Sequence, residues 1–290
     1  MSKGFVIGAA LVLAGLMLEL GVGPVVWETF AWPVNGIVFA AFLTIIAAVF
    51  LLRKKIRAFR FIGTYQAAIP ALTYAIVLTV IMGLTRQTVG GTWLNSMLTF
   101  WPFVLIYVYM ALILGIVILK QLGRWVAARF SLSAFPFSLL SHFGLFLAMT
   151  TATLGNADMQ RLRMITVVGE PEWRGLTQEN TIRELPLTIE LKQFIMETYD
   201  DGSPKRFASE IQILTRSGKN IQATVDVNKP IEVEGWKIYQ YGYDTRMGAM
   251  SQTSVLELVR DPWLPLVYTG IYMMIVGAVC MLLKGKRVKK

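Results

Sequence analysis

The sequence contains a single histidine, His142, within a stretch of mainly apolar residues. If this stretch crosses a membrane, an ionisable side chain inside it marks a functional site by default, because its desolvation is costly. Neutral imidazole is a common iron ligand, and haem takes an axial histidine in many proteins. His142 is therefore a candidate axial ligand of haem iron. The alternative is a structural role, in which the ring hydrogen-bonds to a neighbouring helix.

A lone histidine limits what this chain can do by itself. It cannot form a zinc site, a relay of histidines or both axial ligands of a bis-histidine haem, so any second histidine ligand must come from another polypeptide. Cys280 is the only cysteine, which excludes a CxxC pair and an internal disulfide. The sequence also contains no nucleotide-binding, serine-hydrolase or zinc-protease motif, and hence no evident catalytic machinery of its own.

Glu19 is the second ionisable candidate inside an apolar stretch, and Gly21, Gly23 and Pro24 follow it closely. A carboxylate at such a position can carry protons or pair with a cation. The alternative is that Glu19 lies where a helix ends near the membrane interface, because charges are tolerated there. The sequence favours this second interpretation.

Six apolar segments must position these residues. The chain has 290 residues, of which 55% are hydrophobic and 16% charged, a composition typical of membrane proteins. A helix needs about 20 mainly apolar residues to cross the hydrocarbon of a bilayer. The segments of that length are 5–26, 33–52, 63–85, 100–119, 135–154 and 263–283. His142 lies about seven residues, or ~10 Å, into the fifth.

Basic residues indicate which ends of these segments face the cytoplasm. They cluster after the second, fourth and sixth segments, whereas the connection between the first two has none and that between the third and fourth has only Arg86. Because cytoplasmic loops are enriched in Lys and Arg, both termini are predicted to be cytoplasmic. The net charge of +10 therefore reflects membrane topology and does not indicate a nucleic-acid partner.

The polar segment before the last apolar segment has a different character. Residues 155–261 contain 16 of the 18 Asp and Glu residues and only 13 Lys and Arg. The topology places this segment outside the membrane, in the periplasm of a bacterium. Apolar and polar residues alternate along it, which is typical of half-buried strands, and Gly218 lies in a predicted hairpin turn. The strand-like runs are 164–168, 185–191, 211–213, 221–227, 235–241 and 254–259.

These patterns together predict an α-helical polytopic membrane protein with six transmembrane helices. A β-rich periplasmic domain, a sandwich or a barrel, is inserted between the fifth and sixth helices. The expected domains are a membrane domain at 1–154, the periplasmic domain at 155–262, and the last helix with a basic cytoplasmic tail at 263–290. The expected location is the bacterial inner membrane.

Several motifs near the end of the polar segment resemble those of a known family. They are Asn228-Lys229-Pro230, Gly235-Trp236-Lys237-Ile238-Tyr239-Gln240, Tyr243-Asp244 and Leu258-Val259-Arg260-Asp261-Pro262. With Ser141-His142-Phe143-Gly144 and Ala31-Trp32-Pro33-Val34-Asn35, they are similar to the ResB (Ccs1, CcsB) family of cytochrome c biogenesis proteins, system II. The similarity runs from about Phe135 to the C-terminus, and over the first four segments it rests mainly on layout.

The resemblance implies one subunit of a complex that moves haem across the membrane and attaches it to apocytochrome c. The expected partners are a CcsA/ResC-like membrane protein, apocytochrome c and the lipid bilayer. The expected cofactor is haem b, held transiently, with His142 as its axial ligand. Because the tryptophan-rich external haem motif belongs to the CcsA-like partner, this chain would be part of a haem lyase without a complete active site.

Two other functions remain open from the sequence alone. The chain can be a noncatalytic scaffold that docks apocytochrome while the partner holds haem. It can also be an unrelated redox or transport subunit that carries a β-rich domain.

Overall fold

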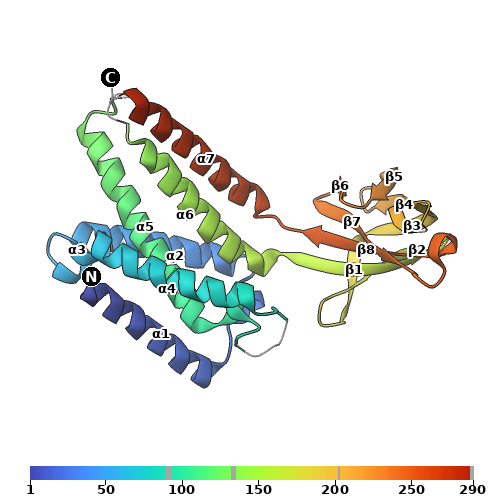
Figure 1. Cartoon of the computed structure of the whole chain (residues 1–290), viewed down its shortest axis with the longest axis horizontal. Helices are drawn as coiled ribbons and strands as arrows, with labels where there is room; N and C mark the ends of the chain where they lie inside the picture. The colour runs from blue at the N-terminus through green and yellow to red at the C-terminus, as the bar shows by residue number, and fades with distance from the viewer. Residues whose placement is uncertain (89–92, 132–134, 202, 288–290) are drawn as a thin grey trace. The chain divides into compact units, whose positions relative to one another are not determined.

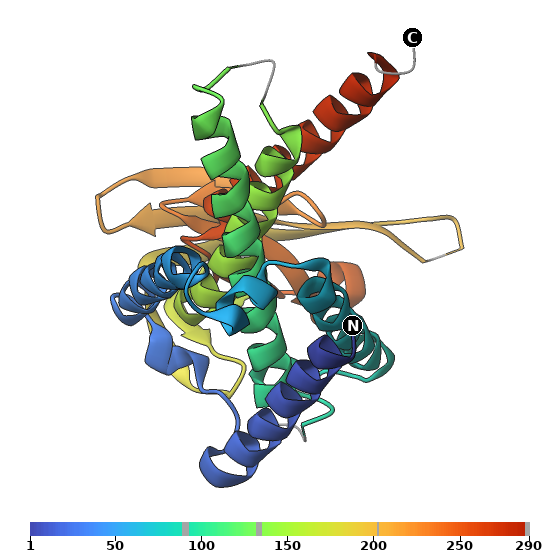
Figure 2. The ribbon, with the colours of Figure 1, turned by 90° about the vertical axis from the view of Figure 1, so that its left-hand side faces the viewer.

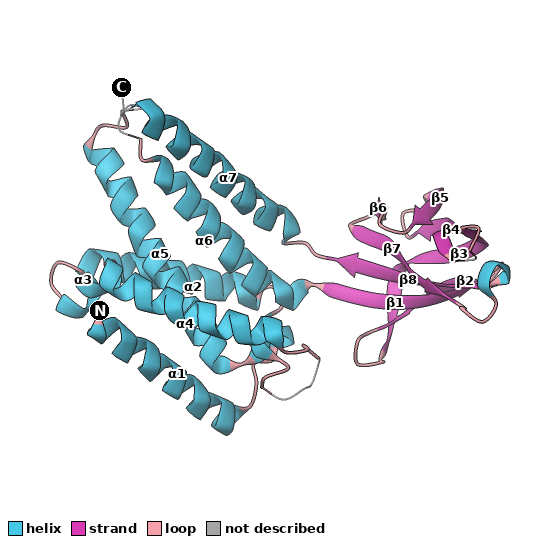
Figure 3. Ribbon diagram, viewed as in Figure 1, coloured by secondary structure: helices cyan, strands magenta, loops and turns pink. Residues whose placement is uncertain are grey.

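The computed structural model describes residues 1–88, 93–131, 135–201 and 203–287. The chain forms two compact units, one of residues 1–158 with 263–290 and the other of residues 159–262. The first unit is built from helices and the second from strands, as Figure 3 shows. Each unit is described by itself below.

Seven α-helices make up the first unit over the described residues. They are α1 (Ser2–Val22), α2 (Val34–Leu52), α3 (Arg57–Ile62), α4 (Tyr65–Leu84), α5 (Trp101–Ala127), α6 (Phe137–Gly155) and α7 (Leu264–Arg287). All except the short α3 are long and apolar enough to cross a membrane, so the six predicted apolar helices are confirmed. The fourth predicted segment ends at residue 119, but α5 continues to Ala127. It therefore carries polar residues that the sequence analysis assigned to a loop.

Small residues allow helices α6 and α7 to pack closely, and the two run side by side in Figure 1. A Cβ atom added to Gly144 would lie 2.8 Å from the backbone nitrogen of Met274. A Cβ atom added to Gly270 would lie 2.7 Å from the backbone nitrogen of Ala148. Neither contact leaves room for a side chain, so these two glycines set the distance between the helices.

Glu19 stabilises the start of α5. Its Oε2 accepts a hydrogen bond of 3.2 Å from the backbone nitrogen of Trp101, the first residue of that helix. The indole Nε1 of Trp101 donates to the carbonyl oxygen of Gly23 at 2.9 Å. A carboxylate at a helix N-terminus satisfies an otherwise free N–H group and interacts favourably with the helix dipole. Glu19 thus has a structural partner at the end of α1.

A second carboxylate joins three parts of the helical unit. Asp158 ends the short 3₁₀ helix η4 (Asn156–Asp158), which follows α6 directly. Its oxygens accept hydrogen bonds from the backbone nitrogen of Trp32 at 2.8 Å, from Asn35 Nδ2 at 2.8 Å and from Trp263 Nε1 at 2.6 Å. Asn35 is fully buried and also donates to the carbonyl of Leu154. We call Asp158, Trp32, Asn35 and Trp263 the Asp158 cluster.

Over its described residues, the second unit is a single antiparallel sheet of eight strands. The strands are β1 (Gln160–Val167), β2 (Pro171–Leu176), β3 (Ile182–Thr198), β4 (Pro204–Thr215), β5 (Asn220–Asp226), β6 (Ile231–Val233), β7 (Trp236–Tyr243) and β8 (Thr253–Arg260). Their order in the sheet is β5-β4-β3-β2-β1-β8-β7-β6. The first and last strands pair in register from Gln160 with Arg260 to Val167 with Thr253. Strands β3 and β4 form a long hairpin, visible in Figure 2.

The core of the sheet lies on the side that alternation predicts. On β3, Leu185, Leu187, Ile189 and Leu191 are buried, as expected for half-buried strands. Apolar residues from β1, β4, β5, β7 and β8 join them in one cluster. Side chains of β4 also reach β7 and β8, which are distant in strand order, so the sheet curls into a barrel-like form.

Strand β7 carries the Trp236–Gln240 motif, and its alternation explains the motif's composition. Trp236, Ile238 and Gln240 point into the core, whereas Lys237 and Tyr239 lie on the other face. The turn before β7 places Glu234 at φ 48° and Gly235 at φ 81°, a two-residue hairpin of the type that favours glycine. The predicted turn at Gly218 is also confirmed, with φ 81°.

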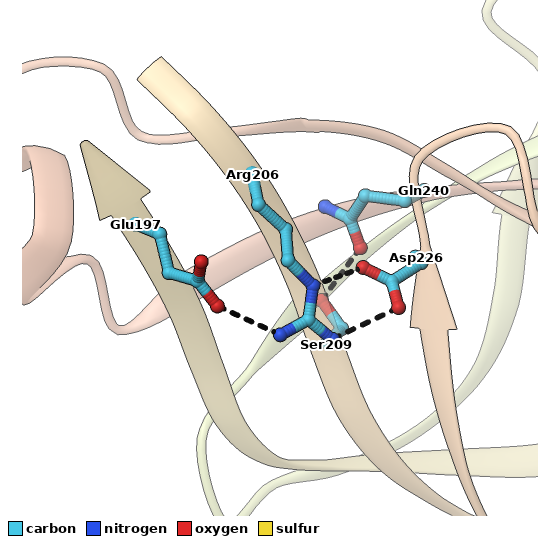
Figure 4. A network of polar contacts seen from close by, with 5 residues as sticks. All are labelled: Glu197, Arg206, Ser209, Asp226 and Gln240. Carbon is cyan, nitrogen blue, oxygen red and sulfur yellow. Dashed lines mark hydrogen bonds and ion pairs between the residues drawn. The ribbon is translucent and has the colours of Figure 1, made fainter. Parts of the chain in front are cut away.

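Gln240 is the polar member of this inward face, and it is fully partnered. It accepts a hydrogen bond from Ser209 Oγ at 2.7 Å, shown in Figure 4, and donates to the carbonyl of Gly242 and to Ser254 Oγ. Ser209 and Ser254 are fully buried and lie 2.7 Å apart between their hydroxyl oxygens. Because buried polar groups must be satisfied, this network fixes how β4 meets β7 and β8.

Candidate functional site

His142 lies on α6, five residues after the helix begins at Phe137. Its ring is half-buried and contacts two polar neighbours, one on its own helix and one on α5. The Nδ1 atom lies 2.6 Å from the backbone carbonyl oxygen of Ser138, one turn earlier. It also lies 3.2 Å from the side-chain amide of Gln121, which is 6% exposed. We call His142, Ser138 and Gln121 the His142 site.

The carbonyl of Ser138 determines which nitrogen of the ring carries the proton. A carbonyl oxygen can only accept a hydrogen bond, so Nδ1 must donate and therefore carries the proton of the neutral ring. The amide of Gln121 lies 3.2 Å from both Nδ1 and the Ser138 hydroxyl. Because Nδ1 donates its one proton to the Ser138 carbonyl, the hydroxyl is the group that remains able to donate to Gln121. Turning the Oε1 atom of Gln121 toward them gives this otherwise unpartnered oxygen the Ser138 hydroxyl as a donor and places no second N–H group against Nδ1–H.

This arrangement leaves Nε2 as the basic nitrogen of His142. Within the described residues, Nε2 makes no hydrogen bond, so no protein donor occupies its lone pair. Metal-binding histidines commonly donate their other N–H to a carbonyl oxygen, which fixes the ring and raises the basicity of the ligating nitrogen. The donor set around His142 therefore fits an axial ligand of haem iron.

Glu19 does not belong to the same site. It contacts residue 101 at the start of α5, whereas His142 contacts residue 121 of that helix. Twenty residues of α-helix span ~30 Å at 1.5 Å per residue, so the two ionisable candidates are far apart.

Gln121 and Ser138 were missed by the sequence analysis. Gln121 follows the predicted end of the fourth segment by two residues and was assigned to a basic connection. The available signal was the spacing of Ser138 and His142, which lie four residues apart and so on one helix face. Nothing in the sequence indicated that Gln121 lies beside them.

Charged groups of the sheet unit lie away from its buried core. Arg206 donates to both oxygens of Asp226, at 2.6 and 2.9 Å, and to Glu197 at 3.0 Å, as Figure 4 shows. These hydrogen bonds raise the pKa of Arg206, and the Arg206 guanidinium holds the pKa of Asp226 below its usual value. On β2, hydrogen bonds from Arg174 lower the pKa of Glu172 to about 2. Such exposed pairs typically contribute little to stability.

The fold and the His142 site define a class of helical protein. In this class a β-rich unit is inserted between the fifth and sixth long apolar helices, and the fifth of these helices carries a histidine. Residues 136–253 match the ResB-like family. This match confirms the resemblance to the ResB/CcsB family that the sequence motifs indicated, over the segment that begins with α6 and extends through most of the sheet.

Curated relatives that are similar to part of this chain are named cytochrome c biogenesis protein CcsB or Ccs1. The cytochrome c biogenesis protein CcsB of Prochlorococcus marinus (strain NATL1A) is 27% identical over 121 residues, which are 42% of this chain and 28% of that protein. CcsB of Synechococcus sp. (strain RCC307) is 29% identical over 147 residues, 50% of this chain and 33% of that protein. Ccs1 of Rhodomonas salina is 27% identical over 124 residues, 41% of this chain and 28% of that protein. The match thus spans about a third of these relatives or less.

Among solved structures, a cytochrome c heme lyase CcmF is similar to this chain with a TM-score of 0.38 and 15% sequence identity. The similarity covers 74% of this chain and 34% of CcmF.

Proposed function

We propose that this chain is a ResB-like subunit of a cytochrome c haem delivery and ligation complex. Its six apolar helices would lie in the bacterial inner membrane with both termini in the cytoplasm, and the sheet unit would be periplasmic. The family match and the names of the curated relatives support a role in cytochrome c maturation. The clustering of basic residues at alternate connections supports the orientation.

The observation that carries the proposal is the hydrogen bond from His142 Nδ1 to the Ser138 carbonyl. It orients the ring and leaves Nε2 as a ligand for the iron of haem b, held transiently. Bound haem would supply the iron and the vinyl groups that are joined to apocytochrome c. This chain would hold and orient the haem, and a CcsA/ResC-like partner would supply the second axial ligand.

The test is a visible absorption spectrum of the detergent-purified complex with a CcsA/ResC-like partner. We expect a Soret band in the wild type and its loss, or a several-fold decrease, in His142→Ala. Loss of a group that orients a metal ligand typically costs 10–100-fold in affinity, so Gln121→Leu should weaken haem retention without removing the ligand. An equal yield of folded complex by size-exclusion chromatography excludes a folding defect.

Two results would contradict this assignment. A Soret band of unchanged intensity in His142→Ala would place the ligand in the partner, and this chain would then be a noncatalytic scaffold that docks apocytochrome. The second result has two parts: the purified complex contains no haem, and c-type cytochromes mature normally in cells from which this chain is deleted. Together these would indicate an unrelated redox or transport subunit.

A further inference from the structure

The helical unit contains a cavity of about 610 Å³ that lies apart from the His142 site. Residues from α1, α3 and α5 line it, among them the apolar side chains of Ile7 and Phe61. Three cations also line it: Lys3 near the start of α1, and Arg57 and Arg60 on α3. Its volume is within the range of ~300–1,000 Å³ typical of small-molecule sites.

Tyr109 of α5 lines this cavity, and its hydroxyl is buried in the wall without a hydrogen-bond partner among the described residues. The residue is 9% exposed, and within the described residues its hydroxyl makes no hydrogen bond. A buried hydroxyl without a partner is unfavourable, so a ligand atom that accepted its hydrogen bond would be favoured at this position. The cavity therefore combines an apolar wall, an unused donor and three positive charges.

The helical unit offers these cations no carboxylate of its own. It contains 15 Lys and Arg but only three Asp and Glu, which are Glu19, Glu28 and Asp158. Glu19 hydrogen-bonds to Trp101 and Asp158 belongs to the Asp158 cluster. None of the three lines the cavity. Lys3, Arg57 and Arg60 are exposed, and within the part of the chain that the structure describes they form no ion pair, so their charges are free to meet an anionic group from outside the chain.

We propose that this cavity binds an anionic phospholipid, with the headgroup phosphate near Lys3, Arg57 and Arg60 and the Tyr109 hydroxyl donating to a lipid oxygen. The apolar wall would contact the acyl chains. Basic pockets between membrane helices are known to bind anionic headgroups, and a lipid matches both the charge and the apolar surface. The inference rests on the membrane insertion proposed above, but it does not depend on haem binding.

The test uses the full chain in detergent, stripped of lipid, and measures binding by native mass spectrometry. Phosphatidylglycerol and phosphatidylcholine with the same acyl chains are compared, together with inorganic phosphate. We expect phosphatidylglycerol to bind at least tenfold more tightly than phosphatidylcholine. The Lys3→Gln, Arg57→Gln and Arg60→Gln triple variant should lose this preference, and Tyr109→Phe should weaken phosphatidylglycerol binding by about tenfold.

The control variant is Lys54→Gln with Lys55→Gln, since these residues lie in the same basic segment but do not line the cavity. It should bind phosphatidylglycerol as the wild type does. Equal affinity for the two lipids, or an unchanged preference in the triple variant, would overturn the proposal. Inorganic phosphate that binds as tightly as phosphatidylglycerol would overturn the assignment to a lipid. The Soret band of the complex gives an independent measure of haem binding, so a failure of either proposal is distinguishable from a failure of the other.

Discussion

The carboxylate of Asp158 accepts a hydrogen bond of 2.6 Å from the indole nitrogen of Trp263, although 105 residues separate the two along the chain. The helical unit stops at Asp158 and resumes at Trp263, so this contact joins the point where the chain leaves the unit to the point where it returns. A Cβ atom on Gly155 would lie 2.6 Å from Trp263 Cγ, which shows how closely the two segments approach. One hydrogen bond thus joins the residue that ends η4, after α6, to the residue that precedes α7.

Asp158→Ala should destabilise the helical unit. The change removes the acceptor for Trp263 Nε1 and one of the two acceptors of Asn35 Nδ2. Asn35 is fully buried, and loss of a hydrogen bond from a buried donor costs about 1–3 kcal/mol. We expect a lower midpoint of thermal unfolding, followed by tryptophan fluorescence in detergent. Glu28→Ala, which removes an exposed carboxylate, is the control and should leave the midpoint unchanged. Equal midpoints for the two variants would show that the Asp158 cluster contributes little to stability.

Gly270→Leu should prevent α6 and α7 from packing. Its side chain would meet the backbone of Ala148, which cannot move aside as a flexible side chain can. We expect a large loss of folded, monodisperse protein in size-exclusion chromatography. Gly83→Leu is a matched control because a Cβ atom at Gly83 meets nothing within 4 Å. If the two variants gave the same yield, close approach at Gly270 would not be needed for folding.

Gln240→Met should destabilise the sheet unit by about 1–3 kcal/mol. Methionine has a similar size but leaves Ser209 without its carboxamide acceptor in the core. Chemical unfolding of the full chain in detergent, followed by circular dichroism, measures the change. Lys237→Met lies on the opposite face of the same strand and should cost much less. A similar cost for both variants would indicate that β7 tolerates no change on either face.

The Glu172–Arg174 pair predicts a dependence of stability on pH. The pKa of Glu172 is lowered from 4.5 to about 2, chiefly because the Arg174 side chain donates hydrogen bonds to it. The charged carboxylate therefore stabilises the folded chain above pH 4.5, and this contribution is lost as pH falls from 4.5 toward 2. Glu172→Gln should lower the thermal midpoint at pH 7 and have less effect at pH 3.

The control for that comparison is Glu179→Gln, which removes an exposed carboxylate from the same unit. Glu172→Gln could also lower the thermal midpoint by the same amount at pH 7 and pH 3. Such a constant difference from the wild type would indicate lost packing and would contradict an effect of charge.

Local patterns in the sequence predict most of the elements. The six long helices follow from runs of apolar residues, and β3, β4 and β7 follow from alternation that the burial of Leu187 and Ile213 confirms. Strand β2 was missed because Pro171–Leu176 contains too few apolar residues to alternate. It forms because β1 and β3 supply hydrogen-bonding partners on both sides. The short α3 was missed because it lies within a basic connection.

The sites were harder to predict than the elements. His142 was singled out from its residue type alone, since an imidazole in an apolar helix is unusual. Its neighbour Gln121 and the partners of Asp158 depend on contacts between residues 21 to 126 positions apart, which no local pattern records. The cavity beside Tyr109 likewise needs three helices in place before its lining exists.

The in-register pairing of Gln160 with Arg260 has a practical consequence for dissecting the molecule. The sheet is a modular insert whose two ends leave and rejoin the helical unit next to each other. Joining Asp158 to Trp263 through a short glycine linker would excise the insert while sparing both partners of the hydrogen bond between them. The shortened chain would retain all seven described helices, so the proposed membrane insertion, haem retention and lipid binding can each be tested with and without the insert.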